Sequence, residues 1–115
     1  CTTIGTTAAL VGLTITPPAG QYVYLSSFSV TVIPNATGSN STAAYTSTNL
    51  TGSPVWLVGE FSNAAGLATV STMQVNDVYP TGLKSQSAGT AVTLIPNATL
   101  ASASVCPRAT AWFGP

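Results

Sequence analysis

The asparagines that begin Asn-x-Ser/Thr triplets are the residues whose type and spacing point most directly to chemistry. This triplet is the acceptor pattern for N-linked glycans when its middle residue is not proline, and four copies satisfy that condition. Chance accounts for one or two such triplets in a chain rich in Ser, Thr and Asn, whereas four favour glycosylation of an exported protein. We therefore predict covalent N-linked glycans on Asn35 and Asn97, and partial modification of Asn40 and Asn49.

The two cysteines, Cys1 and Cys106, provide a second kind of covalent chemistry. No Cys-x-x-Cys or Cys/His cluster is present, so the pattern supports neither a metal site nor thiol redox catalysis. An even number of cysteines beside glycan acceptor sites indicates a disulfide in an oxidising compartment. A mature chain that begins with cysteine also fits a lipidated bacterial surface protein, but lipidation would leave Cys106 unpaired, so we favour the disulfide. Closure within one subunit and closure between two subunits both stay open.

Charged side chains are scarce, and this excludes several function classes. The chain has no histidine, and its charged residues are Glu60, Asp77, Lys84 and Arg108. The usual Ser and Cys triads need a histidine, and two carboxylates on unrelated strands are poor candidates for a glycosidase pair, so we predict no enzyme activity and no cofactor. Scattered charges make no cationic stripe for nucleic acid, and no apolar stretch approaches the ~20 residues of a membrane-spanning helix.

The low charge also raises a question of solubility. Charged residues make up 3% of the chain, against about 25% in an average soluble domain. Hydroxyl and amide groups and a coat of neutral glycans would keep such a surface in solution. Alternatively, much of the surface is covered because the protein packs against copies of itself.

An octapeptide that occurs twice connects the acceptor sites to structure. Val30–Thr37 reads VTVIPNAT and Val92–Thr99 reads VTLIPNAT. Alternation of β-branched or apolar residues with Thr predicts a strand with one buried face, and proline, which cannot donate to a ladder, ends it. Each copy therefore predicts a strand that leaves its sheet at the proline and presents the following asparagine on a loop.

The chain as a whole is predicted to be all-β, because helix-favouring Glu, Lys, Arg and Gln are rare while Thr, Ser, Val, Gly and Pro dominate. Turn-forming clusters lie between the candidate strands, including residues 17–20, 38–40, 51–53 and 79–82. Seven short strands at this spacing predict a two-sheet sandwich. The candidate strands are Leu10–Thr16, Tyr22–Ile33, Ala43–Thr48, Pro54–Phe61, Leu67–Val75, Gly89–Ile95 and Ala101–Phe113.

The N-terminal residues do not form one regular strand. Alternating residues up to Leu10 share one face, whereas those from Val11 onward share the other, so the apolar phase changes between the two. We divide the chain into an extension, residues 1–9, and a sandwich, residues 10–115. The extension is either an edge strand that crosses between sheets or a donor strand that completes another subunit's sheet. Its predicted interface residues are Ile4, Thr6, Ala8 and Leu10.

Aromatic residues add candidates for packing and binding. Trp56 is typical of the tryptophan that packs against the opposite sheet, with a ligand platform as the alternative. Tyr22 and Tyr24 share a strand face and are expected to cover an edge or an interface. Trp112 and Phe113 are hard to bury within one domain, so we predict that they dock on a neighbouring subunit.

The order of these segments resembles the bacterial immunoglobulin-like group two domain. The resemblance spans about Leu10 to Val105 and lies in LVGLTITPPAG, YVYLSSFSVTVIP, SPVWLVG, LATVST and GLKSQSAGTAVTLI. Residues 73–81 are longer than that family's usual turn. The resemblance implies an all-β, immunoglobulin-like two-sheet sandwich that serves as a cell-surface module without catalytic residues. Its second and sixth strands would run in the same direction in opposite sheets. Pro34-Asn35 and Pro96-Asn97 would then lie at one end of the sandwich.

These expectations together describe an extracellular or cell-surface protein. The predicted function is a structural subunit of a glycosylated, pilus-like filament, similar in plan to donor-strand-complemented pilins and assembled head to tail by β-strand addition. The alternatives are a monomeric adhesin or stalk module that binds a receptor or glycan, and a unit of an S-layer-type sheet.

Overall fold

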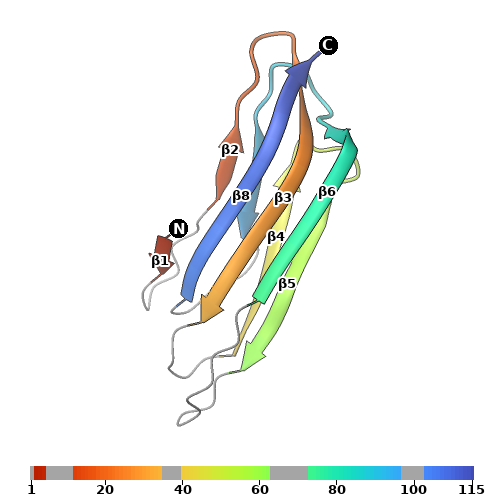
Figure 1. The fold of residues 1–115 in the computed structure, drawn as a ribbon. Coiled ribbons are helices and arrows are strands. Elements are labelled where there is room, and N and C mark those ends of the chain that lie inside the picture. The colour runs from red at the N-terminus through yellow and green to blue at the C-terminus, as the bar shows by residue number, and fades with distance from the viewer. Residues whose placement is uncertain (1, 5–11, 35–39, 63–72, 97–102) are drawn as a thin grey trace.

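The described residues form eight antiparallel strands in two packed sheets (Figure 1). The computed structural model describes residues 2–4, 12–34, 40–62, 73–96 and 103–115. Sheet A has the order β1 (Thr2–Ile4), β8 (Ala103–Gly114), β3 (Tyr22–Pro34) and β6 (Met73–Lys84). Sheet B has the order β2 (Leu13–Ile15), β7 (Val92–Pro96), β4 (Asn40–Thr48) and β5 (Val55–Ser62). The predicted all-β, immunoglobulin-like two-sheet sandwich is confirmed.

The connectivity adds a feature that the sequence did not predict. The last strand, β8, pairs with β3 in sheet A, whereas the last strand of an immunoglobulin domain lies in the sheet of the strand that precedes it. The resulting order is that of a double Greek key, or jelly roll, in which successive strands from β5 onward alternate between the sheets. The two shortest strands, β1 and β2, therefore lie at the same side of the sandwich (Figure 1).

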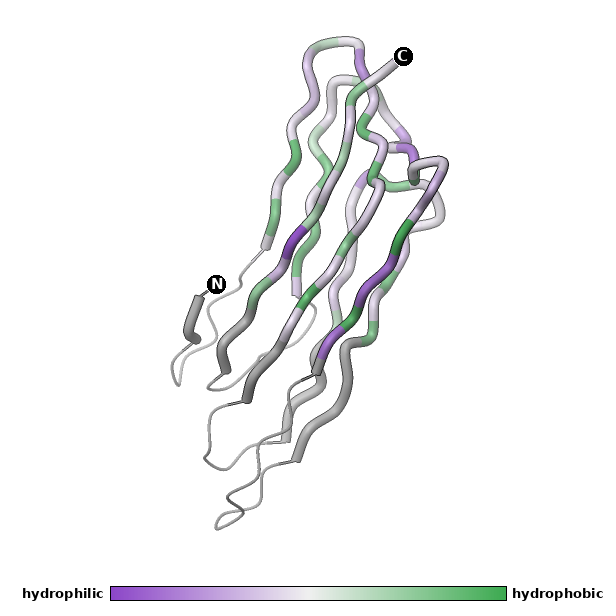
Figure 2. The backbone as a smooth tube through the Cα atoms, viewed as in Figure 1, coloured by the Kyte–Doolittle hydropathy of each residue, from purple (hydrophilic) through white to green (hydrophobic). Residues whose placement is uncertain are grey.

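Alternation of apolar and polar residues builds the core between the sheets (Figure 2). In β3 the buried side chains first follow the parity of Val23 and Leu25 and then that of Phe28 and Val30. The parity changes because a bulge at Ser26 inserts one residue between the paired positions. The buried core cluster consists of Val23, Leu25, Phe28, Val30, Tyr45, Leu50, Trp56, Val92 and Leu94.

The bulge in β3 faces a larger irregularity in β6. Leu25 pairs with Leu83 and Ser27 with Val78, so residues 79–82 of β6 lie opposite Ser26 alone. The sequence predicted a strand over Leu67–Val75 and a turn at residues 79–82, and this prediction was wrong for β6, which continues to Lys84. The strand passes through Pro80 and Gly82 as a bulge and does not end there, because Tyr79 and Leu83 keep their packing against the core.

The two strands that carry the repeated octapeptide run in the same direction. β3 and β7 lie in different sheets, and both end, at Pro34 and Pro96, at the same end of the sandwich (Figure 1). The asparagines that follow, Asn35 and Asn97, lie outside the described residues. The molecule is elongated along these strands, with principal extents of 53 × 26 × 21 Å.

Candidate functional site

The outer edge of β8 is the first candidate site, because β1 covers only its beginning. β1 pairs antiparallel with β8 of the same chain, with Thr2 opposite Val105 and Ile4 opposite Ala103. β2 belongs to sheet B, where it pairs with β7. The chain therefore crosses between the sheets, as expected for an edge strand. Within the described part of the chain, no strand pairs with the outer edge of residues 107–114.

The structure describes one of the four predicted interface residues of the extension. Ile4 lies in β1 at the sheet edge, and the other three, Thr6, Ala8 and Leu10, lie outside the described residues. Pairing of this segment with another subunit stays a prediction.

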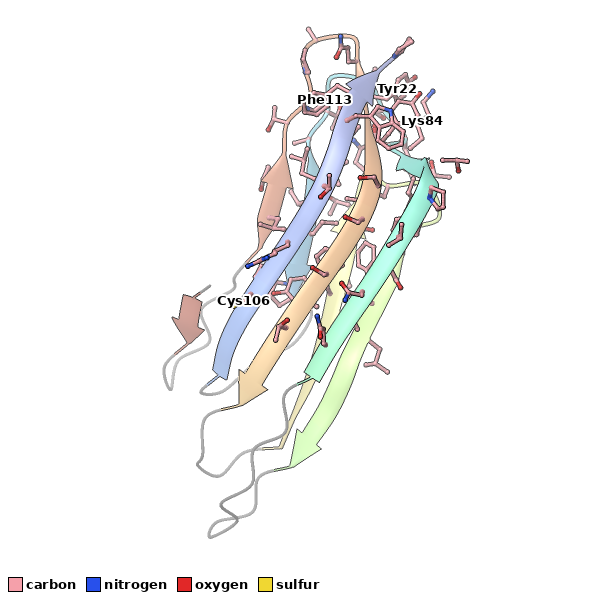
Figure 3. All side chains as sticks on the ribbon, viewed as in Figure 1. Tyr22, Lys84, Cys106 and Phe113 are labelled. Carbon is pink, nitrogen blue, oxygen red and sulfur yellow. The ribbon has the colours of Figure 1, made fainter. Side chains whose placement is uncertain are left out.

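An aromatic cluster near the C-terminal end of β8 is the second candidate site (Figure 3). The ring of Tyr24 stacks on Trp112 with centroids 5.4 Å apart and an interplanar angle of 3°. The Nζ atom of Lys84 lies 3.8 Å from the centroid of Tyr22. Trp112 and Phe113 remain 42% and 43% exposed. The expected exposure of these two residues is thus present, whereas their docking on a neighbour stays a prediction.

Strand register brings the aromatic cluster together. Tyr24 is paired with Trp112 on one side and with Lys84 on the other, so three adjacent strands contribute to one outer face. The indole reaches across β3 to Gly82, where an added Cβ would lie 2.5 Å from Trp112. Sequence reasoning identified the aromatic residues but missed Lys84 and Gly82, because cross-strand neighbours depend on a register that no local motif encodes.

Asn49 is a glycan-acceptor candidate that has a structural role. Its Nδ2 atom, to which a glycan would be attached, donates hydrogen bonds to the carbonyl oxygens of Ser87, Thr90 and Ala91 at 3.4, 2.9 and 3.4 Å. Its Oδ1 atom accepts from the Ser87 backbone N–H at 3.0 Å. Asn49 has a φ of 60°, a left-handed conformation that Asn tolerates better than most residues. The side chain therefore anchors the loop between β6 and β7.

The structure gives less information on the other three glycan-acceptor asparagines. Asn40 is the first residue of β4 and pairs with Ser62, and its side chain is outside the described set. Asn35 and Asn97 are outside the described residues altogether. Glycosylation of these three residues stays a prediction.

Cys106 lies in β8 with the same parity as the exposed Arg108, as the sequence predicted for the outer face. Its side chain is partly buried and is not a free thiol. Cys1 lies outside the described residues, so the pairing of Cys1 with Cys106 stays a prediction.

Trp56 closes the opposite side of the sandwich, between β5 and β6. Its side chain is 3% exposed, and its ring lies 4.6 Å from that of Phe28 at 45°, so it is a core residue and not a ligand platform. Its Nε1 donates to the Tyr79 hydroxyl oxygen at 2.9 Å, and that hydroxyl in turn donates to Asp77 Oδ2 at 3.5 Å. Burial raises the pKa of Tyr79, so the hydroxyl stays protonated as a donor at neutral pH.

The described residues offer little else for chemistry. They include no group of three or more His, Cys, Asp or Glu side chains that could hold a metal ion. They also contain no helix that is long and apolar enough to cross a membrane. Comparison of the chain with protein-family models, curated proteins and solved structures gave no match. The resemblance to the bacterial immunoglobulin-like group two domain therefore stays a prediction.

Proposed function

We propose that this protein is a structural subunit of an extracellular, glycosylated, pilus-like filament that assembles head to tail by β-strand addition. The observation that carries the proposal is the incomplete cover of β8, where β1 pairs with residues 103–105 and no described strand pairs with residues 107–114 on that side. An unpaired edge offers a row of N–H and C=O groups to another chain, and natural monomers usually protect such edges.

The polarity of the sandwich supports a head-to-tail contact. One end carries the strand stops at Pro34 and Pro96, whereas the other end carries the aromatic cluster of Tyr22, Tyr24 and Trp112. Because the two ends differ, contact between them is heterologous, and a heterologous contact that does not close into a ring extends into a filament. The low charge, 3% of residues, means that little electrostatic repulsion opposes such packing.

Covalent modification belongs to the same proposal. Glycans on Asn35, Asn97 and Asn40 would keep a surface with so few charges in solution, whereas Asn49 stays unmodified in the folded protein because Nδ2 is held by the 87–91 loop. Glycopeptide mass spectrometry of the native protein tests this directly. Sugar on most copies of Asn49, or none on Asn35 and Asn97, would contradict it.

A disulfide between Cys1 and Cys106 fits the register of β1. Thr2 lies opposite Val105, so extension of this antiparallel register by one residue sets position 1 opposite position 106. The bond would form within one subunit when β1 pairs with its own β8, and between subunits when the segment is exchanged. Non-reducing electrophoresis of filaments distinguishes a single monomer band from a covalent ladder.

Electron microscopy of the native material tests the filament itself. We expect long fibres of uniform width, and we expect a chain that lacks residues 2–9 to fold but to lose fibre formation. Isolated particles from the native source would overturn the proposal.

A monomeric adhesin or stalk module is the second candidate, and the exposed aromatic cluster favours it. Stacked Tyr24 and Trp112 beside Lys84 are residue types that also bind sugars and peptides. For this function we expect isolated particles and a ligand whose binding is lost in Trp112→Ala. Fibres that form equally well with Trp112→Ala would separate the cluster from assembly.

A further inference from the structure

We infer that the outer face of sheet A binds an acidic oligosaccharide, with one sugar ring against the indole of Trp112 and carboxylate groups at Lys84 and Arg108. The inference rests on the second candidate function and deepens it by naming the site and the class of ligand that an adhesin or stalk module would use. It does not depend on filament assembly.

Strand register arranges this outer face in three rows, which together we call the sheet A face. Each row runs from β8 through β3 to β6, and the rows are Trp112 with Tyr24 and Lys84, Thr110 with Ser27 and Val78, and Arg108 with Ser29 and Asn76. Neighbouring residues of opposite parity, such as Leu25, Phe28 and Ala109, pack in the core. Because β3 is paired on both sides, its backbone groups are used in the two ladders, and a ligand on this face must be bound by side chains.

Trp112 offers one face of its indole to a ligand. Tyr24 stacks on the other face, with centroids 5.4 Å apart and an interplanar angle of 3°, and Gly82 lies against the edge of the indole. The indole nevertheless stays 42% exposed, in an orientation that these contacts fix. A flat aromatic face that is already held in place suits the C–H face of a sugar ring and loses little conformational entropy on binding.

The charges of the sheet A face favour an acidic ligand. Lys84 and Arg108 are both exposed, and neither forms an ion pair with another residue in the described part of the chain. Of the two acidic residues, Asp77 has inward parity and accepts a hydrogen bond from Tyr79, and Glu60 belongs to β5 of sheet B. The described face is therefore cationic, and its guanidinium and ammonium groups can bind carboxylates through charge-assisted hydrogen bonds.

Hydroxyl and amide side chains lie between and beside the indole and the guanidinium group. Along β8, Arg108 and Trp112 are about 13 Å apart at about 3.3 Å per residue. The side chains of Thr110, Ser29 and Asn76 form no hydrogen bond with other described residues, so their polar groups are open to a ligand. An oligosaccharide presents ring hydroxyls over such a length. A nucleic acid strand would instead need repeated phosphate contacts, and the described face has a cation only at each end.

Calorimetric titration of the native protein tests the inference. The probes are oligomers of galacturonic acid, guluronic acid and glucuronic acid, each beside its carboxyl-reduced form, which keeps the rings but removes the negative charges. We expect at least one acidic oligomer to bind about tenfold or more tightly than its reduced form, and this binding to weaken as salt rises. No binding of any acidic oligomer, equal binding of acidic and reduced forms, or tighter binding of a thymidine oligonucleotide would overturn the inference.

Substitutions on the sheet A face locate the site. Arg108→Gln and Lys84→Gln should each weaken binding about two- to fivefold, as expected for exposed charge pairs, and Trp112→Ala should weaken it about tenfold. Leu57→Ala, at an exposed apolar residue on β5 of sheet B, is the matched control and should bind as the unmodified protein does. Unchanged binding in both Arg108→Gln and Lys84→Gln would overturn the inference.

Tryptophan fluorescence of the unmodified protein decides the role of the indole if Trp112→Ala does not fold. Trp56 is 3% exposed and Trp112 is 42% exposed, so quenching by acrylamide reports mainly on Trp112. A bound acidic oligomer should reduce this quenching, and quenching that stays the same at saturation would overturn stacking on Trp112.

Electron microscopy of the same native preparation separates this inference from the proposed filament. Fibres without binding of an acidic oligomer would overturn the sheet A face as a binding site and leave the filament standing. Binding without fibres would overturn the filament and support the sheet A face as the binding site of an adhesin or stalk module.

Discussion

The two edge regions of sheet A, on β6 and on β8, differ in the regularity of their strands and in the residues that they carry. On β6 the residues from Tyr79 to Gly82 bulge away from β3, and they include Pro80. Asp77, one residue before Val78, has the inward parity of the core-packed Val75 and Tyr79. On β8 the pairing with β3 runs without a break from Cys106 to Thr110, with Pro107 opposite Val30.

This difference is the one expected between a protected edge and a binding edge. A bulge breaks the regular spacing of N–H and C=O groups, and a carboxylate with inward parity would lose water if another strand covered it. β6 has both features. The outer edge of β8, residues 107–114, has neither feature, and Arg108, its charged residue, lies on the outer face. Under the proposed function, sheet A would resist strand addition at β6 and accept it at β8.

Among the substitutions near β6, Trp56→Ala is expected to destabilise the fold most. It removes a buried ring that contacts Phe28 and leaves the Tyr79 hydroxyl without its donor. We expect the free energy of unfolding to fall by about 3–5 kcal/mol, the usual range for a buried aromatic residue truncated to alanine. Urea denaturation followed by tyrosine fluorescence measures this.

Tyr79→Phe is the control for Trp56→Ala, because it keeps the ring but removes the acceptor of the indole N–H. A loss of about 1–2 kcal/mol is expected from one broken, partly buried hydrogen bond. If both variants lose the same amount, the hydrogen bond and not the packing of Trp56 closes this side of the sandwich.

Gly82 links the two edges, since the indole from β8 lies against it in the bulge of β6. Gly82→Ala must accommodate a φ of +76° and a contact of 2.5 Å to Trp112, so we expect a loss of about 2–4 kcal/mol. Gly20→Ala is the matched control, with a φ of +77° and no atom within 4 Å of the added Cβ. Its loss should be about 1–2 kcal/mol from backbone strain alone. Equal losses in thermal unfolding would show that the aromatic contact has no effect.

High pH should lower the free energy of unfolding through Tyr45, a residue of the core between the two sheets. Burial raises the pKa of Tyr45 to about 12 from 10.0, and its ring packs 5.4 Å from that of Phe28. The folded state keeps this hydroxyl protonated, so stability is complete below about pH 10, where the unfolded chain is protonated too. Between about pH 10 and 12 the unfolded chain ionises first, and roughly 2–3 kcal/mol should be lost. Denaturation of Tyr45→Phe over the same range should show a shallower dependence, and an equal slope would contradict this assignment.

Most strands were predictable from the sequence because alternation and turn chemistry are local. The predicted strand Tyr22–Ile33 differs from β3 by one residue. The prediction failed where non-local contacts hold residues that usually end strands, as with Pro80 and Gly82 inside β6. The position of β8 beside β3 likewise depends on which sheet the last strand joins, and periodicity carries no information about that choice.

The candidate sites, like the strands, could be predicted only where local sequence patterns determine them. The sequence predicted the exposure of Trp112, whereas the contact of Lys84 with Tyr22 depends on strand register. Asn49 has the same triplet pattern as the other acceptor sites, and only its bonds to the loop at 87–91 distinguish it. The open outer edge of β8 was invisible in sequence because it arises from the shortness of β1 relative to β8.

The smallest effect is expected from Val78→Lys on the protected edge. Val78 is 73% exposed, so the substitution should change the free energy of unfolding by less than about 0.5 kcal/mol. Leu57→Lys on β5, the edge strand of sheet B, is a matched control at 65% exposure. Filaments should form normally with Val78→Lys, because an edge that excludes strand addition gains nothing from a further charge. Loss of filaments with Val78→Lys but not with Leu57→Lys would mean that the β6 edge is itself an assembly surface, and the contrast between the two edges of sheet A would then be wrong.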